Sequence, residues 1–153
     1  DGRFIVLAET AGEFSRKPGE GLLFPGDPVE GAEPVSFLLE TDGGYQPTDM
    51  AQLPDGRVLI LLRALGLGLP PFAGRLVVAD PADIRPGQPW PWQLFAELDD
   101  PLPRDNYEGL AIISADNGPT DSGAATIWVI SDDNNAVLHR SLLLKLHWDP
   151  DAQ

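Results

Sequence analysis

Short hydrophobic runs recur along the whole chain and are separated by turn-forming residues. Gly and Pro number 16 each, which favours many connections over long helices. This pattern is typical of an all-β protein made of antiparallel strands. Nine runs are long enough to form strands: 3–8, 35–39, 49–53, 58–62, 75–79, 93–98, 107–113, 126–130 and 141–147.

The hydrophobic runs differ in which faces they would bury. The run 58–62 is apolar at every position, so we expect a strand buried on both faces. The run 141–147 has leucine on one face and mixed residues on the other, as an outer strand would. Segments 12–31 and 64–74 are rich in Gly and Pro, and we expect them to be surface loops or the rim of a site.

A polar segment followed by two apolar strands occurs twice, about 60 residues apart, which indicates a repeat architecture. Each copy places acidic residues near strand ends, where a shared site could form. The first copy begins with Pro47-Thr48-Asp49-Met50-Ala51, and the second with Asn106-Tyr107-Glu108-Gly109-Leu110-Ala111.

Grouping the strands gives four-stranded antiparallel units, which are the blades of a β-propeller. We expect one domain over 1–153, with a partial blade over about 1–46, a blade over 47–106, and a blade lacking its last strand over 107–153. The first unit would lack its opening strand, so the chain would be a propeller fragment that self-associates through exposed strand edges. The alternative is a single β-sandwich, which predicts a stable monomer.

Charge and composition narrow the class of partner. The chain has 24 acidic and 10 basic residues, a net charge of −14, which argues against nucleic acid and anionic membranes as partners. No cysteine is present, so disulfides and thiolate metal sites are excluded. No apolar stretch approaches the roughly 20 residues of a membrane span, and no signal peptide is visible. Serine-esterase, zinc-protease and nucleotide-binding motifs are also absent from the sequence.

Acidic residues at two strand ends are the candidates for a metal site. Glu108 heads an otherwise apolar strand, where a carboxylate is costly to bury unless it is paired or coordinated. Asp132, followed by Asp133 and Asn134, ends the neighbouring strand. Oxygen ligands of this kind suit Ca²⁺, although Glu108 could instead cap backbone amides and 132–134 could form a turn. Asp49 is the equivalent of Glu108 in the first copy and has the same two interpretations.

Arg63 ends the strand that is equivalent to the one ending in Asp132. Its planar donors could bind an anionic substrate, and the more ordinary alternative is a salt bridge to Asp49 or Glu108. Glu9 follows the first hydrophobic run and has a similar position. In a propeller, these strand ends would converge on one mouth of the channel.

These motifs resemble the phytase-like family described as having esterase-like activity, a group of bacterial β-propellers. The resemblance implies hydrolysis of phosphate or carboxylic esters and export to the periplasm or the medium. Members are longer, so the chain resembles their C-terminal half. The resemblance rests on 47–51 with 53–57 and Leu62-Arg63, on 107–111 with Ile130-Ser131-Asp132-Asp133-Asn134, and on Leu142-Leu143-Leu144-Lys145.

A strongly acidic protein would repel a polyanionic ester unless a bound cation reversed the local field and polarised a water. We therefore expect a metal-assisted ester or phosphoester hydrolase with Ca²⁺ as the metal and an anionic small-molecule ester as the substrate. The predicted metal ligands are Glu108 and Asp132, and the predicted substrate-binding residues are Arg63, Asp49 and Glu9. The alternative function is a non-catalytic propeller that binds a ligand or a protein.

Overall fold

The computed structural model describes residues 2–9, 18–42, 44–66, 69–114, 123–133 and 141–150. Its described residues form ten strands in three antiparallel sheets, which confirms the all-β, antiparallel prediction. Two short 3₁₀ helices, Pro28–Glu30 and Pro81–Asp83, are the helical elements of this part of the chain. None of its helices is long and apolar enough to cross a membrane.

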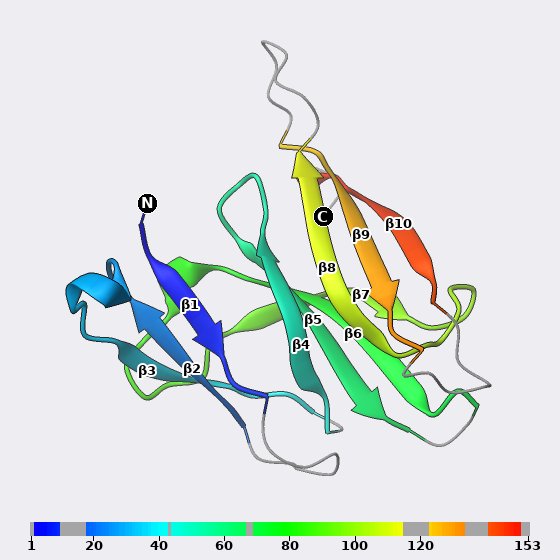
Figure 1. Ribbon diagram of the computed structural model, residues 1–153, viewed down its shortest axis with the longest axis horizontal. Helices are drawn as coiled ribbons and strands as arrows, with labels where there is room; N and C mark the ends of the chain where they lie inside the picture. The colour runs from blue at the N-terminus through cyan, green and yellow to red at the C-terminus, as the bar shows by residue number, and fades with distance from the viewer. Residues whose placement is uncertain are drawn as a thin grey trace.

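Each sheet is built from strands that are consecutive in the sequence (Figure 1). The first sheet has the order β1 (Phe4–Leu7), β2 (Gly19–Phe24) and β3 (Val35–Leu39). The middle sheet has the order β4 (Gln46–Gln52), β5 (Val58–Leu65), β6 (Phe72–Ala79) and β7 (Trp92–Leu98). The third sheet contains β8 (Tyr107–Ser114), β9 (Ala125–Ser131) and β10 (Leu143–Trp148), with β9 in the centre.

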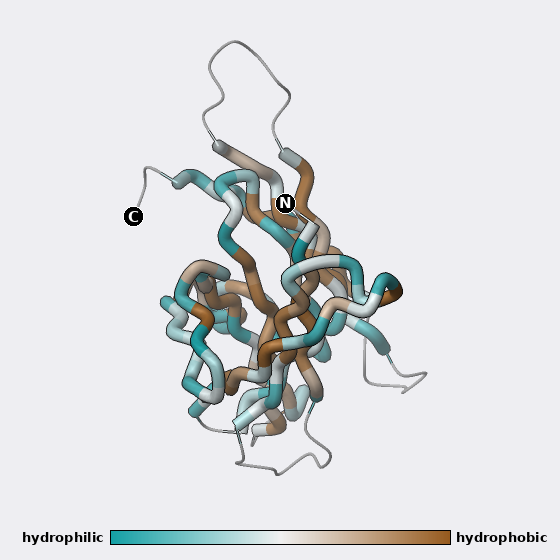
Figure 2. Tube along the Cα trace, turned by 90° about the vertical axis from the view of Figure 1, so that its left-hand side faces the viewer, coloured by the Kyte–Doolittle hydropathy of each residue, from teal (hydrophilic) through white to brown (hydrophobic). Residues whose placement is uncertain are grey.

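The strand β5 of the middle sheet is buried on both faces, as its continuous apolar run predicted. Leu59 and Leu61 join a core cluster with residues of the third sheet, whereas Ile60 and Leu62 join a cluster with residues of the first sheet. All four side chains are fully buried. Figure 2 shows hydrophobic residues gathered along the strands in the middle of the molecule and hydrophilic residues in many of the turns. The two hydrophobic cores therefore hold three sheets in series.

The three sheets lie one beside another, with the middle sheet between the other two (Figure 1). A β-sandwich would have two packed sheets, so the described strands do not form a single sandwich. The described residues also close neither a barrel nor a ring. The propeller and its blade limits therefore remain predictions.

The strand β2 lies inside a segment that the sequence analysis assigned to a loop. The prediction of a loop over 12–31 is wrong for Gly19–Phe24, and 10–17 lie outside the described residues. Gly21 has a packing reason: a Cβ at this position would lie 2.2 Å from the Phe37 ring. The predicted loop over 64–74 is also shorter, since β5 extends to Leu65 and β6 begins at Phe72. Glycine content was misleading here because it reflected close packing as well as turns.

Candidate functional site

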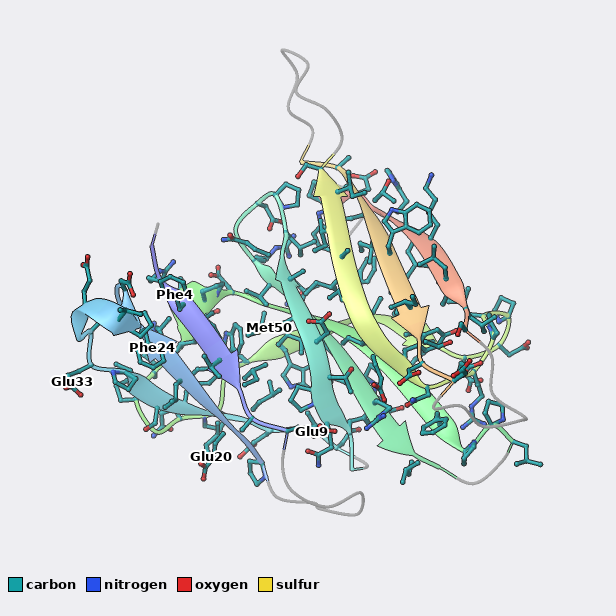
Figure 3. All side chains as sticks on the ribbon, in the orientation of Figure 1. Phe4, Glu9, Glu20, Phe24, Glu33 and Met50 are labelled. Atoms are coloured by element: carbon teal, nitrogen blue, oxygen red, sulfur yellow. The ribbon has the colours of Figure 1, made fainter. Side chains whose placement is uncertain are left out.

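Arg63, near the end of β5, connects all three sheets. Its Nη1 donates to Oδ1 of Asn106 at 2.6 Å and to Oε1 of Glu108 at 2.5 Å. Its Nη2 donates to Oε1 of Glu9 at 3.2 Å. Glu9 follows β1 of the first sheet (Figure 3), whereas Glu108 lies at the start of β8 in the third sheet and Asn106 directly precedes that strand. We call these four residues the polar cluster.

Asn106 links Glu108 to Asp132. Its Nδ2 donates to Oε1 of Glu108 at 2.8 Å and to the main-chain carbonyl of Asp132 at 3.2 Å. The main-chain carbonyl of Asn106 accepts the N–H of Asp132 at 2.9 Å. Asn106 is fully buried, so these contacts fix the orientation of its amide. Asn106 was not among the site residues predicted from the sequence. The available signal was its position two residues before Glu108, because alternate strand residues share a face.

Asp132 lies beside the polar cluster. Its main-chain N–H and carbonyl make the described contacts with Asn106. The next residue, Asp133, accepts a long hydrogen bond of 3.4 Å from Ser141. Asn134, the last residue of the predicted acidic strand end, lies outside the described residues. The structure therefore brings Asp132 close to Glu108, as the sequence predicted, with Asn106 between them.

Asp49 joins β4 to β8 rather than pairing with Arg63. Its Oδ2 accepts the N–H of Leu110 at 2.7 Å, and its Oδ1 accepts the N–H of Met50 at 2.8 Å. The described side-chain hydrogen bonds of Arg63 go to Glu9, Asn106 and Glu108. Of the two salt bridges that the sequence suggested for Arg63, the one to Glu108 forms. Asp49 caps backbone amides, which is the alternative role that the sequence suggested for Glu108 and Asp49.

The polar cluster contains one guanidinium and two carboxylates, which gives it a net charge of −1. Ca²⁺ takes six to eight oxygen ligands. Among the described residues, no group of three or more His, Cys, Asp or Glu side chains could hold a metal ion. Oε1 of Glu108 already accepts hydrogen bonds from Arg63 and Asn106. Arg63 would therefore compete with a bound cation for this oxygen of Glu108.

A second arginine provides a useful comparison. Arg75 in β6 pairs with Asp42 at 2.6 Å and with Glu97 at 2.9 Å, and it lies 4.2 Å from the Tyr45 ring. Burial raises the pKa of Tyr45, partly opposed by the nearby Arg75 charge. Burial lowers the pKa of Arg75, but its hydrogen bonds to Glu97 and Asp42 leave it raised. Arg75 thus resembles Arg63 in having two carboxylate partners, without a described contact to the third sheet.

The fold and the polar cluster define an all-β protein with an arginine–carboxylate site where three antiparallel sheets meet. The family model described as "Phytase-like: Esterase-like activity of phytase" matches residues 1–135, and the chain belongs to this phytase-like family. This confirms the family resemblance found in the sequence. No curated protein and no solved structure matches the chain.

Proposed function

We propose that the protein hydrolyses carboxylic or phosphoric esters and that the polar cluster binds the ester group. The observation that carries the proposal is the convergence of Arg63 with carboxylates from the two outer sheets. A guanidinium presents planar N–H donors that match the oxygens of a carboxylate or phosphate. Membership in a family described by esterase-like activity supports the same chemistry.

Glu9 is the partner of Arg63 that a substrate oxygen would displace. Its side chain is 57% exposed, and its contact to Nη2 is the longest of the three at 3.2 Å. Exposed ion pairs of this kind contribute only about 0–1 kcal/mol. The substrate would then occupy the Nη2 side, while Asn106 and Glu108 keep hold of Nη1. Asp49, also predicted to bind substrate, would act indirectly by holding β4 against β8.

Glu108 is the residue best placed to act on a water molecule. Its carboxylate is held by Arg63 and Asn106, and its side chain remains 38% exposed. A positioned carboxylate can accept a proton from water as the water attacks an ester. Asn106 fixes the direction of this carboxylate, because its own amide is fully engaged and buried.

Replacing Arg63 tests the proposed binding of the ester group. In a screen of carboxylic esters and phosphoesters, we expect Arg63→Gln to lower kcat/KM about thirtyfold, which corresponds to the loss of one charge-assisted contact of about 2 kcal/mol. The matched control is Arg75→Gln, which also removes an arginine with two carboxylate partners. Equal rates in both variants and in the unmodified protein would contradict the proposal.

The proposal includes the role of Ca²⁺ that the sequence predicted, with Glu108 and Asp132 as its ligands. Arg63 forms a salt bridge with Glu108, so its positive charge competes with a bound cation. We therefore expect the Arg63→Gln variant to bind Ca²⁺ about tenfold more tightly than the unmodified protein. Calorimetric titration measures this difference, with Arg75→Gln as the control. Absence of binding heat in all three proteins would rule out Ca²⁺ at this site.

A second candidate function is a non-catalytic binding module, which is favoured by one observation. The side-chain hydrogen bonds of Arg63 reach both neighbouring sheets, so the polar cluster can also be understood as a connection between sheets. Ligand binding without turnover in the ester screen would favour this function. Export to the periplasm or medium, and self-association through strand edges, remain predictions from the sequence.

A further inference from the structure

Arg104 contacts the connection between β5 and β6. Its Nε donates to the carbonyl of Phe72 at 3.0 Å. Its Nη2 lies close to Gly66, because a Cβ built on that glycine would be 3.4 Å from this nitrogen. Phe72 begins β6 and pairs with Leu65, the last residue of β5. Arg104 therefore lies at the same end of β5 as Arg63.

Phe72 connects Arg104 to the polar cluster. The guanidinium of Arg63 lies over the Phe72 ring, with its Cζ 5.9 Å from the ring centroid. Arg104 reaches the same residue through its main-chain carbonyl. Arg104 is also two residues before Asn106, which holds Nη1 of Arg63. Two guanidinium groups are thus brought to the region where β5 ends and β6 and β8 begin (Figure 1).

The contacts of Arg104 leave its outer nitrogens able to bind an anion. Within the described part of the chain, neither Nη1 nor Nη2 makes a hydrogen bond, and the side chain is 31% exposed. The ion pair with Asp99 is long, at 3.8 Å from Nε to Oδ1, and an exposed pair of this kind holds its partners weakly. Arg57, by contrast, binds Asp55 through both Nε and Nη2, at 2.9 and 2.8 Å.

Charge favours a ligand that binds both arginines. The polar cluster carries a net charge of −1 and the whole chain −14, so a single guanidinium attracts an anion against a repulsive field. A ligand with two anionic groups gains from two guanidinium groups, because binding of one group raises the effective concentration of the other. Arginine suits this task, since its planar donors match both carboxylate and phosphate oxygens.

We propose that Arg63 and Arg104 together select an ester that carries a second anionic group, a carboxylate or a phosphate. The ester group binds Arg63, and the second group binds Arg104. This inference rests on the proposed function for its Arg63 half and adds Arg104 as the residue that determines specificity. Because Arg104 contacts a group that does not react, it stabilises the bound substrate and the transition state equally, and it lowers KM without changing kcat.

Matched esters test this specificity. The charged substrates are monomethyl esters of linear dicarboxylic acids of about four to eight carbons, since binding is strongest when the linker matches the span between the two sites. Each is compared with the methyl ester of the linear monocarboxylic acid that has the same number of carbons. We expect Arg104→Gln to raise the KM of the best charged ester about tenfold, with kcat unchanged, and to leave the neutral esters unaffected.

Arg85→Gln is the control variant for these assays. Arg85 also donates to main-chain carbonyls, those of Ala82 and Ile84, but it follows the end of β6 that is opposite to Phe72. We expect this variant to hydrolyse charged and neutral esters like the unmodified protein. Equal losses on charged and neutral esters in Arg104→Gln, or an equal rise in KM in Arg85→Gln, would overturn the proposal.

Calorimetry with dicarboxylates tests the same site without requiring turnover. We expect the best linear dicarboxylate to bind the unmodified protein about tenfold more tightly than the matching monocarboxylate, and Arg104→Gln to bind the two alike. Ester hydrolysis without this preference would contradict the role of Arg104 and leave the proposed hydrolysis intact. The preference without hydrolysis of any ester would contradict the proposed hydrolysis and support the site formed by the two arginines. Absence of both would contradict both.

Discussion

Gly21→Ala is expected to lower the free energy of unfolding by about 3 kcal/mol, near the upper end for overpacked cores. A Cβ at this position would lie 2.2, 2.4 and 2.7 Å from three atoms of the Phe37 ring. The ring has little room to move, because Phe37 is 1% exposed and packs edge-on against Trp90 at 5.3 Å. Urea denaturation followed by tryptophan fluorescence measures the change.

Gly19→Ala is the matched control for this substitution. Gly19 lies two residues away on β2, and its added Cβ would meet its nearest atoms at an ordinary 3.6 Å. We expect it to change stability by no more than about 0.5 kcal/mol. Phe37→Leu in the Gly21→Ala background should recover part of the lost stability, because the two positions share one space. Equal effects of the two glycine substitutions would contradict the packing of Phe37 over Gly21.

Leu61→Ala and Leu62→Ala are each expected to cost about 3 kcal/mol, since each removes a fully buried leucine from a core. The two side chains leave β5 in opposite directions, Leu61 towards the third sheet and Leu62 towards the first. In a sheet with one solvent-facing side, one of the two substitutions would be nearly neutral. Chemical denaturation of both variants therefore measures burial on both faces of the middle sheet.

Leu94→Ala provides the reference for the leucine pair. Leu94 belongs to the same sheet but is 51% exposed, so we expect a loss below about 1 kcal/mol. If either Leu61→Ala or Leu62→Ala resembled Leu94→Ala, one of the two sheet contacts would be absent. The experiment thus tests separately the packing of the middle sheet against each neighbour.

The sequence predicted those parts of the fold whose hydrophobic pattern has one interpretation. The run 58–62 is apolar throughout, and only burial on both faces explains it. The strand β2 was missed because Gly19 and Gly21 are also typical of loops. The packing role of Gly21 depends on Phe37, which pairs with it across β2 and β3. Such a requirement becomes visible only after the strands are paired.

The sequence predicted more of the residues in the candidate site than of the contacts between them. The sequence placed Glu9, Arg63 and Asp132 at equivalent strand ends. In the structure Arg63 contacts Glu9 directly and reaches the Asp132 main chain through Asn106. Asn106 was missed because a neutral amide carries no charge signal, and its one signal was its spacing of two residues from Glu108. Asp49 binds backbone amides of Met50 and Leu110 because its partner at that point is the β8 main chain.

Assembly of the polar cluster from three sheets links site occupancy to the thermal stability of the molecule. A ligand that binds Arg63 while Asn106 and Glu108 hold its guanidinium binds the folded state and raises its melting temperature by mass action. A thermal-shift screen of carboxylates, phosphates and sugar phosphates would therefore detect the natural ligand before its reaction is known. The size of the shift would report how strongly that ligand depends on the docking of the three sheets.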